Sequence, residues 1–280
     1  MVLQDLTLQA LNVSLMLSVG LELDREQLGA AARRWRLLLG VIVANFALIP
    51  ALAVVATASF ALPTAVTAGI LLCAFTPGGG TGTLLTRTAR GNLELSVVML
   101  GLLTALAVPL TPLLVMTALT ADGARLDLTA LLRTLLLFQL LPLALGVGVR
   151  RHWVGVAERL GSVARPLSNV LFAALVLGLL ITRGHLVFAI GGLALVLIAL
   201  LVLASLIVPL LGASGTEDRA ALSLTTAVRN LSLSLLLSSA FFGDLTTITV
   251  LSYGLMMYLL AVPWALHLRR ARARDQRQRA

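Results

Sequence analysis

The stretch that decides the fold is "LLCAFTPGGGTGTLLTRTARGNLELS", residues Leu71 to Ser96. A proline and three glycines, Pro77 to Gly80, interrupt a hydrophobic run there, and the half that follows is polar. Residues 63–76 would form only about 21 Å of helix, which is too short for a hydrocarbon layer of about 30 Å. A membrane crossing at this point therefore also needs residues 81–90, with a break near its middle.

The composition is that of a membrane protein. Hydrophobic residues make up 59% of the 280 residues and charged residues only 12%, and the mean hydropathy is +1.01. Because apolar runs of about 20 residues span a bilayer, the sequence predicts an all-α polytopic membrane protein. Its N-terminus shows no basic segment or small-residue cleavage site, so we expect no removable signal peptide. The single cysteine, Cys73, excludes an intrachain disulfide and a cysteine-based metal cluster.

We predict nine transmembrane helices in one domain, residues 1–280. Their expected ranges are 5–23, 35–58, 63–90, 92–119, 126–149, 166–183, 186–212, 217–242 and 245–268. All 21 residues counted as lysine or arginine are arginines, and this arrangement puts 17 of them on one side of the membrane. These are Arg25, Arg33, Arg34, Arg36, Arg87, Arg90, Arg150, Arg151, Arg159, Arg165, Arg219 and the six arginines of the tail 269–280.

The arginine distribution predicts the orientation. Arg125 and Arg183 fall on the opposite side, so the positive-inside rule puts the C-terminus in the cytoplasm and the N-terminus outside, in a bacterial inner membrane. We interpret the basic tail as a topology anchor that contacts anionic membrane lipid. The net charge of +9 is dispersed around hydrophobic spans, so we expect no nucleic-acid partner.

A second anomaly, Arg229-Asn230, lies near the centre of the expected span 217–242. The two unusual spans are five apart in order, so they run in opposite directions, as an inverted-topology repeat requires. We therefore predict a first repeat within 1–119 and a second within 126–268. Broken helices commonly form the substrate site of secondary transporters, because their free backbone groups are tolerated only where they face protein or a cavity. A simple kink packed against neighbouring helices is the alternative for Pro77–Gly80.

Arg229 needs a partner, because an arginine within the membrane is costly unless it is paired or hydrated. None of the twelve carboxylates lies in the middle of a span. Either backbone carbonyls of the broken helices hold the guanidinium as a structural clasp, or a bound anion completes the pairing, or Arg229 is a fixed charge where a relative binds a cation. Thr225, Arg229, Ser232 and Ser239 would form one polar stripe if the helix were regular.

These segments resemble the bile acid:sodium symporter (BASS) family. The resemblance rests on "SLMLSVGLELDREQL" from Ser14, "VIVANFALIP" from Val41, "PGGGTGTLLTRTARGNLELSVVM" from Pro77 and "ALSLTTAVRNLSLSL" from Ala221. It implies a panel domain and a core domain, with two unwound helices crossing at the site. Ten-helix members have one more N-terminal span, so this chain would begin at their second helix.

The resemblance also implies two sodium sites, and several of their ligands are changed in this chain. The family's shared glutamate falls on Thr225 and a glutamine falls on Arg229, while two other oxygen ligands fall on Gly82 and Leu100. We therefore expect the family's fold without conventional sodium coupling, and no cofactor or metal. The positions that match the sodium sites are Asn45, Gly82, Thr83, Ser96, Leu100, Thr225 and Arg229.

We predict a secondary transporter of a small organic anion that is bile-acid-like, keto-acid or pantoate-like and that moves by alternating access. A non-transporting membrane sensor and a sodium symporter with a rearranged site are the alternatives. We expect that the protein is not an enzyme, and we make no prediction about its oligomeric state. The candidate substrate-binding residues are Asn45, Thr81, Thr83, Thr225, Arg229, Asn230 and Ser232, and the helix-break residues are Pro77, Gly78, Gly79 and Gly80.

Overall fold

The computed structural model describes residues 2–23, 26, 29, 33–119, 127–183, 189–207, 209–210 and 215–279. All regular elements within these ranges are helices, and the one isolated bridge that they contain pairs Pro77 with Arg229. The predicted all-α class is therefore confirmed. Arg25 and Arg125 of the charge count, and the ends of some expected spans, lie outside the described residues.

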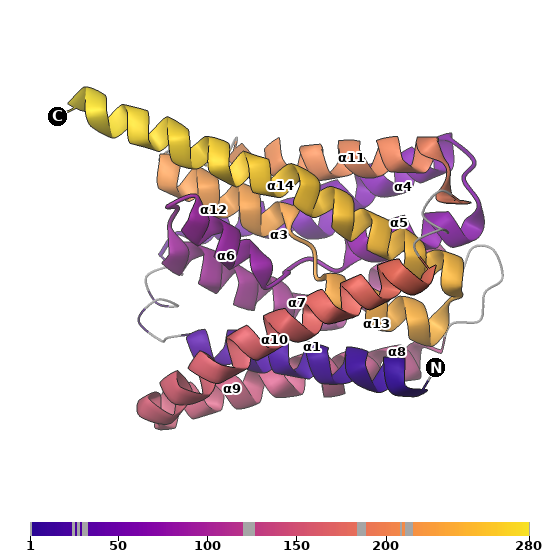
Figure 1. The fold of residues 1–280 in the computed structure, drawn as a ribbon, viewed down its shortest axis with the longest axis horizontal. Coiled ribbons are helices and arrows are strands. Elements are labelled where there is room, and N and C mark those ends of the chain that lie inside the picture. Colours follow the sequence, from indigo (N-terminus) through magenta and orange to yellow (C-terminus); the bar gives the residue numbers. More distant parts are fainter. Residues whose placement is uncertain are drawn as a thin grey trace.

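The helices run roughly along the long axis of the molecule (Figure 1). The N-terminal half contains α1 (Val2–Glu22), α3 (Trp35–Val43), the π-helix η1 (Ala44–Leu48), α4 (Ile49–Ser59), α5 (Thr64–Phe75), α6 (Thr81–Thr88) and α7 (Leu93–Leu119). The C-terminal half contains α8 (Leu128–Leu135), the π-helix η2 (Leu136–Leu140), α9 (Leu141–His152), α10 (Val154–Arg183), α11 (Gly192–Ile207), α12 (Thr216–Ala227), α13 (Leu231–Phe241) and α14 (Asp244–Arg279).

Four described helices are long and apolar enough to cross a membrane, which agrees with an integral membrane protein. They are the continuous helices Trp35–Ser59, Leu93–Leu119, Leu128–His152 and Asp244–Ala271. Each of the nine expected ranges contains helical structure, which is interrupted near the middle in 63–90 and 217–242. Helix α10 already begins at Val154, and α14 continues to Arg279. The tail extends α14 because alanine, arginine and glutamine favour helix. Nine crossings and the inverted repeat remain predictions.

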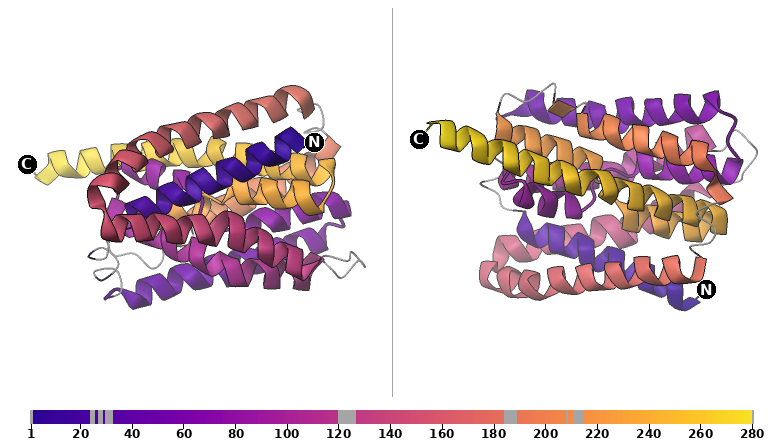
Figure 2. Two further views of the ribbon diagram at one scale, coloured as in Figure 1. Left: turned by 90° about the horizontal axis from the view of Figure 1, so that it is seen from below. Right: turned by 45° about the horizontal axis from the view of Figure 1, so that its top comes forward.

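The helices form two groups. Helix α1 packs against α9 and α10, and these three elements lie together at the bottom of Figure 1. The broken pairs α5–α6 and α12–α13 belong to the other group, where α14 packs along α5, α11 and α13. Figure 2 shows the same division from two further directions. The second half of the first broken helix, α6, lies at the boundary between the two groups, where it and α1 line opposite sides of a pocket.

Two glycines allow close contact between α1 and α9. A Cβ added at Gly20 would lie 2.3 Å from the carbonyl oxygen of Leu143, and one added at Gly146 would lie 2.5 Å from that of Leu17. Lipid tails are as apolar as most side chains, so helices in membranes associate through such close backbone packing. Gly20 and Gly146 therefore allow the backbones of α1 and α9 to pack directly against each other.

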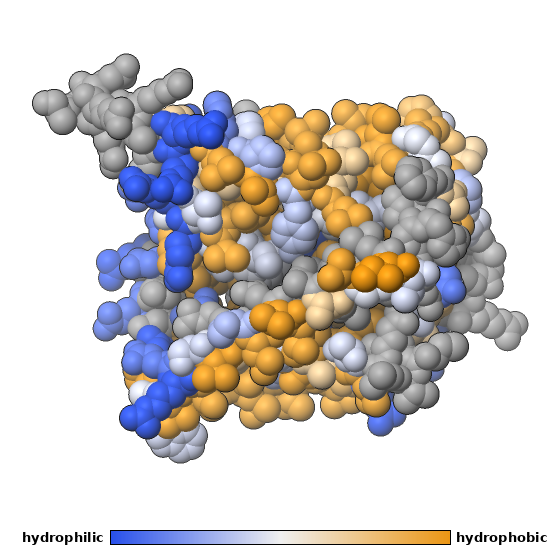
Figure 3. Space-filling view, in the orientation of Figure 1, coloured by the Kyte–Doolittle hydropathy of each residue, from blue (hydrophilic) through white to orange (hydrophobic). Residues whose placement is uncertain are grey.

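Hydrophilic residues collect at one end of the molecule. Figure 3 shows them at its left edge, where α1, α6 and α9 end and where α3 and α12 begin in Figure 1, while apolar residues cover most of the remaining visible face. Arg33, Arg36 and Arg151 are exposed in this set of helix ends. This polarity matches the predicted cytoplasmic side, and the orientation itself remains a prediction.

We expect Gly20→Val to lower the thermal unfolding midpoint of the protein in detergent, because the added methyl groups would collide with the α9 backbone. Forced overpacking of this kind costs about 1–3 kcal/mol. Gly148→Val in α9 is the matched control, since a Cβ there has nothing within 4 Å. Equal midpoints for the two variants would contradict the described α1–α9 contact.

Candidate functional site

The site is built where the two broken helices meet. Helix α5 ends at Phe75 and α6 begins at Thr81, while α12 ends at Ala227 and α13 begins at Leu231. We call the two interruptions, 76–80 and 228–230, the crossing. Two backbone hydrogen bonds join them: Gly79 N donates to Val228 O at 3.0 Å, and Asn230 N donates to Thr76 O at 2.8 Å.

Glycine is required at two positions of the crossing for different reasons. Gly78 has φ +87°, a left-handed conformation that other residues rarely adopt. Gly79 allows close approach, because a Cβ there would lie 2.2 Å from the carbonyl oxygen of Arg229. The interruption at Pro77–Gly80 is therefore more than a kink packed against its neighbours, since its backbone pairs with a second interrupted helix.

The Arg229 side chain is buried and held by side-chain oxygens. Nη1 donates to Oδ1 of Asn45 at 3.1 Å, and Nη2 donates to Oγ of Ser205 at 3.2 Å. Only 1% of the residue is exposed. One alternative from the sequence was that backbone carbonyls of the broken helices accept the hydrogen bonds of the guanidinium. The acceptors are instead side-chain oxygens of η1 and α11. The positive charge thus contacts neutral oxygens contributed by two other helices.

The π-helix η1 positions Asn45 for this contact. Pro50 lies at the start of α4 and has no N–H, so the turn before it cannot keep regular α-helical bonds and widens into the π-helix. Asn45 also donates through Nδ2 to Val41 O at 2.9 Å and to Thr226 Oγ1 at 3.2 Å. Its carbonyl oxygen is therefore held pointing at Arg229.

Thr225 belongs to a second polar cluster, made of neutral hydroxyl groups. Its Oγ1 lies 2.7 Å from Oγ of Ser96, which donates to Oγ1 of Thr86 at 3.2 Å. Thr86 in turn donates to the carbonyl oxygen of Gly82 at 2.9 Å. Leu100 is also buried but supplies no oxygen. Of the seven positions that resemble sodium sites, Thr225, Ser96 and Gly82 meet here, and Asn45 meets Arg229.

The predicted polar stripe does not form, because the helix is interrupted between its members. Thr225 faces Ser96 in α7 and Arg229 faces Asn45 in η1, whereas Ser232 donates at 2.9 Å to Oδ1 of Asn12 in α1. Ser232 also contacts Asn230 Oδ1 at 2.9 Å. Asn230 caps α13 by accepting from Leu233 N at 3.1 Å, so the free N–H groups of this helix start are partly satisfied.

Two pockets lie where the crossing faces α1. The smaller, of about 20 Å³, is lined by Gly80, Thr81, Arg229, Asn230 and Ser232 together with residues of α1 and Tyr258. The larger, of about 100 Å³, shares Gly80 and Thr81 and continues past Thr83 to Glu22 and Arg87. Thr81 Oγ1 lies 2.8 Å from the hydroxyl of Tyr258, and Thr83 donates to Gly80 O at 2.8 Å. Five of the seven candidate substrate residues, all except Asn45 and Thr225, therefore line these pockets.

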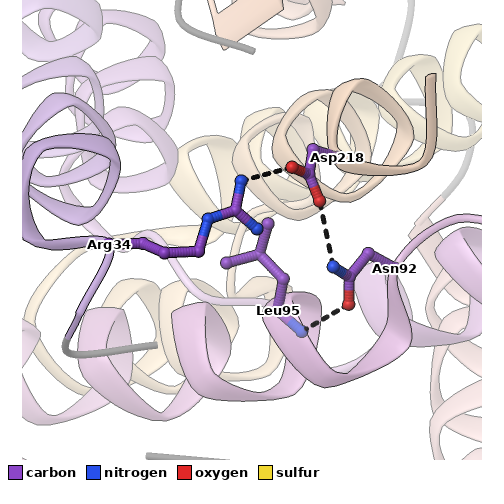
Figure 4. Close-up of polar contacts among 4 residues, drawn as sticks. All are labelled: Arg34, Asn92, Leu95 and Asp218. Carbon is purple, nitrogen blue, oxygen red and sulfur yellow. Dashed lines mark hydrogen bonds and ion pairs between the residues drawn. The ribbon is translucent and has the colours of Figure 1, made fainter. Parts of the chain in front are cut away.

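A polar network fixes three helix starts at the hydrophilic end (Figure 4). Arg34, just before α3, pairs with Asp218 in the first turn of α12, and this hydrogen bond raises the pKa of Arg34 above its ordinary value. Asp218 Oδ1 accepts from Asn92 Nδ2 at 2.9 Å, and Asn92 Oδ1 accepts from Leu95 N at 3.0 Å at the start of α7. The helix that carries Asn45 is thus tied to the broken helix that carries Arg229.

Sequence reasoning missed three polar residues of this region. Ser205 accepts from Arg229, Asn12 joins α1 to α13 and to Phe138 O at 2.7 Å, and Gln139 donates to Thr104 O at 2.9 Å. The sequence signal that could have identified them is that each is a polar residue within an otherwise apolar span. For Gln139 there was a second signal, since Pro142 follows η2 as Pro50 follows η1. Across the described residues, no group of three His, Cys, Asp or Glu side chains could hold a metal ion.

Comparison with known proteins gives a family match. The model of the "Sodium Bile acid symporter family" matches residues 11–196, about two thirds of the chain. This match includes Asn45 and the first interruption, and it ends before α12 and α13.

Two curated proteins are similar to parts of the chain. An "Uncharacterized sodium-dependent transporter YocS" of Bacillus subtilis is 33% identical over 103 residues, which is 36% of this chain and 32% of that protein. A "Probable sodium/metabolite cotransporter BASS1, chloroplastic" of Arabidopsis thaliana is 29% identical over 153 residues, which is 55% of this chain and 38% of that protein. The chain thus spans about a third of the length of each relative.

We expect Gly79→Ala to separate the two interruptions and to lower the thermal unfolding midpoint, because its Cβ would meet the Arg229 carbonyl. The cost should be about 1–3 kcal/mol, with two backbone hydrogen bonds strained together. Gly80→Ala is the control, since a Cβ at this adjacent glycine has nothing within 4 Å. A control that is destabilised as much as Gly79→Ala would contradict the described crossing.

Proposed function

The chain belongs to the sodium bile acid symporter family, and on that premise we propose that it is a secondary transporter of a small organic anion in which Arg229 takes the place of a bound sodium ion. The observation that carries this proposal is the pair of hydrogen bonds from Arg229 to Asn45 and Ser205. The names of both relatives refer to sodium, so the proposal is that this chain departs from them in its coupling.

The guanidinium occupies a position that suits a cation. Neutral amide and hydroxyl oxygens such as those of Asn45 and Ser205 are ligands of hard cations. Asn45 and Arg229 also match two sodium-site positions by family resemblance. A second cation about 4 Å from the guanidinium would be repelled by about 4 kcal/mol in surroundings with an effective dielectric constant near 20. The residues present therefore fit a fixed charge at this point and do not fit sodium.

The other implied sodium position also lacks what sodium needs. Thr225, Ser96 and Thr86 satisfy one another through hydroxyl groups, and none of them carries a charge. Gly82 lies close to this cluster, since an added Cβ would be 3.1 Å from Cα of Thr225. Little space is left for an ion and its ligands between the two helices, which supports a cation-independent site.

The pockets beside α1 support an anionic substrate. The start of α6 has no side-chain cap, so the free N–H groups near Thr81 and Thr83 present positive potential to the larger pocket. In the smaller pocket, Arg229 Nε and Asn230 Nδ2 belong to lining residues and have no acceptor among the described residues. A carboxylate or sulfonate that enters from the side of Arg87 would meet the start of α6 first, whereas the Arg229 guanidinium lies deeper, directed at Asn45 and Ser205. Alternating access would then move the helix groups on the two sides of the pockets relative to each other.

Bile-acid-like, keto-acid and pantoate-like anions are the proposed substrate class, and a bacterial inner membrane is the proposed location. A membrane sensor that binds without transporting is the alternative function, supported by the hydrogen bonds that Asn45 makes through both its amide nitrogen and its carbonyl oxygen. Uptake of a bound anion into proteoliposomes separates the two, because only a carrier gives substrate-dependent flux.

We expect a binding anion to raise the thermal unfolding midpoint equally in sodium and in choline buffer. A ligand at 100 times its dissociation constant stabilises by about 2.7 kcal/mol, which is measurable in detergent. Arg229→Ala should weaken this response and should itself cost about 1–3 kcal/mol, since Asn45 and Ser205 lose their partner. Stabilisation that requires sodium and survives Arg229→Ala would overturn the proposal.

A reciprocal experiment restores the family pattern. Thr225→Glu combined with Arg229→Gln should make the thermal unfolding midpoint sensitive to sodium, though only partly, because Gly82 and Leu100 still supply no ligand oxygen. Arg229→Lys is the control, since it keeps a cation at the site and should stay insensitive to sodium. Sodium sensitivity in the wild-type protein, or in Arg229→Lys, would contradict a fixed-charge site.

A further inference from the structure

A groove of about 390 Å³ lies on the outer surface of α3 and η1, away from the pockets beside α1. Its apolar wall comes from Leu37, Val43, Leu48 and Leu222, and Arg36 lies at one end. The right-hand view of Figure 2 shows the purple α3–α4 segment along an outer edge of the molecule. The groove therefore lies on an outer face of the molecule, which the expected transmembrane arrangement turns toward lipid.

The groove follows one face of the helix. Arg36, Gly40 and Val43 recur at α-helical spacing, and Leu48 follows five residues later, across the π-helix η1. The missing side chain at Gly40 leaves open space, since an added Cβ would have nothing within 4 Å. Val43 is 50% exposed and Leu48 is 41% exposed. From residue 36 to residue 48 a helix rises about 18 Å, close to the depth of one leaflet of a hydrocarbon core about 30 Å thick.

The mouth of the groove carries the features of a membrane interface. Trp35 is 59% exposed, and the Arg36 guanidinium lies over its ring at 5.4 Å. Arg33 is exposed on the same segment, at the hydrophilic end of the molecule. Tryptophan and arginine next to an apolar surface are typical of the headgroup level, and basic groups on the cytoplasmic side attract anionic lipids.

We propose that this groove is a binding site for one anionic phospholipid. Its phosphate contacts Arg36 beside Trp35, and one acyl chain lies along Gly40, Val43 and Leu48. The charge of the mouth selects an anionic over a zwitterionic headgroup, and the length of the apolar wall matches a single chain. A second copy of this protein would instead have to bury the exposed arginines Arg33 and Arg36 against a surface that is equally basic.

The site has a structural consequence for the crossing. Val41 and Ala44 also line the groove, and Val41 O accepts the hydrogen bond that orients Asn45. Leu222 of α12 forms the facing wall, one helical turn before Thr226, the other acceptor of Asn45. A bound acyl chain thus packs against both elements that hold Asn45 toward Arg229, and it stabilises the proposed cation site from the lipid side.

Tryptophan fluorescence tests the site without reference to transport. The protein has three tryptophans, so Trp153→Phe with Trp264→Phe leaves Trp35 as the single reporter at the groove mouth. In mixed vesicles, brominated phosphatidylglycerol should quench Trp35 more strongly than brominated phosphatidylcholine at the same mole fraction. Arg36→Gln should reduce this preference about five-fold, the effect of one arginine at an anionic surface. Gly40→Leu should also reduce it by filling the groove.

Matched control variants distinguish binding in this groove from nonspecific electrostatic attraction of anionic lipid to the basic surface. Arg159→Gln removes an exposed arginine of α10 and Gly148→Leu fills no groove, so both should leave the preference unchanged. A preference that Gly40→Leu leaves intact would mean diffuse attraction and would overturn the proposal. The proposal would also be overturned if neither brominated lipid quenched Trp35 because the groove is covered in a dimer, and if Gly40→Leu dissociated that dimer. If the tryptophan background does not fold, native mass spectrometry of the unaltered protein should still retain phosphatidylglycerol over phosphatidylcholine, and equal retention would refute the site.

Discussion

The mutual hydrogen bonding of two interrupted helices is the constraint on which the rest of this structure depends. A backbone N–H or C=O group left unpaired in hydrocarbon costs several kcal/mol, so a single broken helix is unstable at that depth. Here Gly79 bonds to Val228 and Asn230 bonds to Thr76, so each interruption satisfies part of the other. This exchange requires backbones in near contact, which only a residue without a side chain permits at position 79.

The same crossing explains why a buried arginine is tolerated. Arg229 belongs to the short extended segment, so its side chain leaves the crossing toward η1 and α11 and not toward lipid. Asn45 and Ser205 accept its hydrogen bonds, and neither carries a charge. The buried polar interior of this group of helices is therefore assembled from hydroxyl and amide groups, and the network from Arg34 to Asp218 ties the same helices together at the hydrophilic end.

Much of this arrangement could be predicted from the sequence, for physical reasons. Apolar runs and the Pro-Gly signal at Pro77 determine where helices begin and end, so the ranges and the first break were predictable. The break at Arg229 was predicted from the Arg229-Asn230 anomaly and from the family resemblance, because no proline or glycine marks it and its unwinding depends on pairing with a distant segment. Ser205 could not be assigned either, since contact between α11 and the crossing is a property of the packed fold.

The covalent attachment of the guanidinium has a thermodynamic consequence. A sodium ion enters from one side and leaves on the other, so its gradient performs work in each turnover. A tethered charge returns with the protein, so over a full cycle of the proposed carrier only the charge of the substrate crosses the membrane. The membrane potential then acts on that charge alone, with about 2.3 kcal/mol per elementary charge at 100 mV. In a cell that is negative inside, this term would drive an organic anion outward, so the proposed carrier would favour release over accumulation.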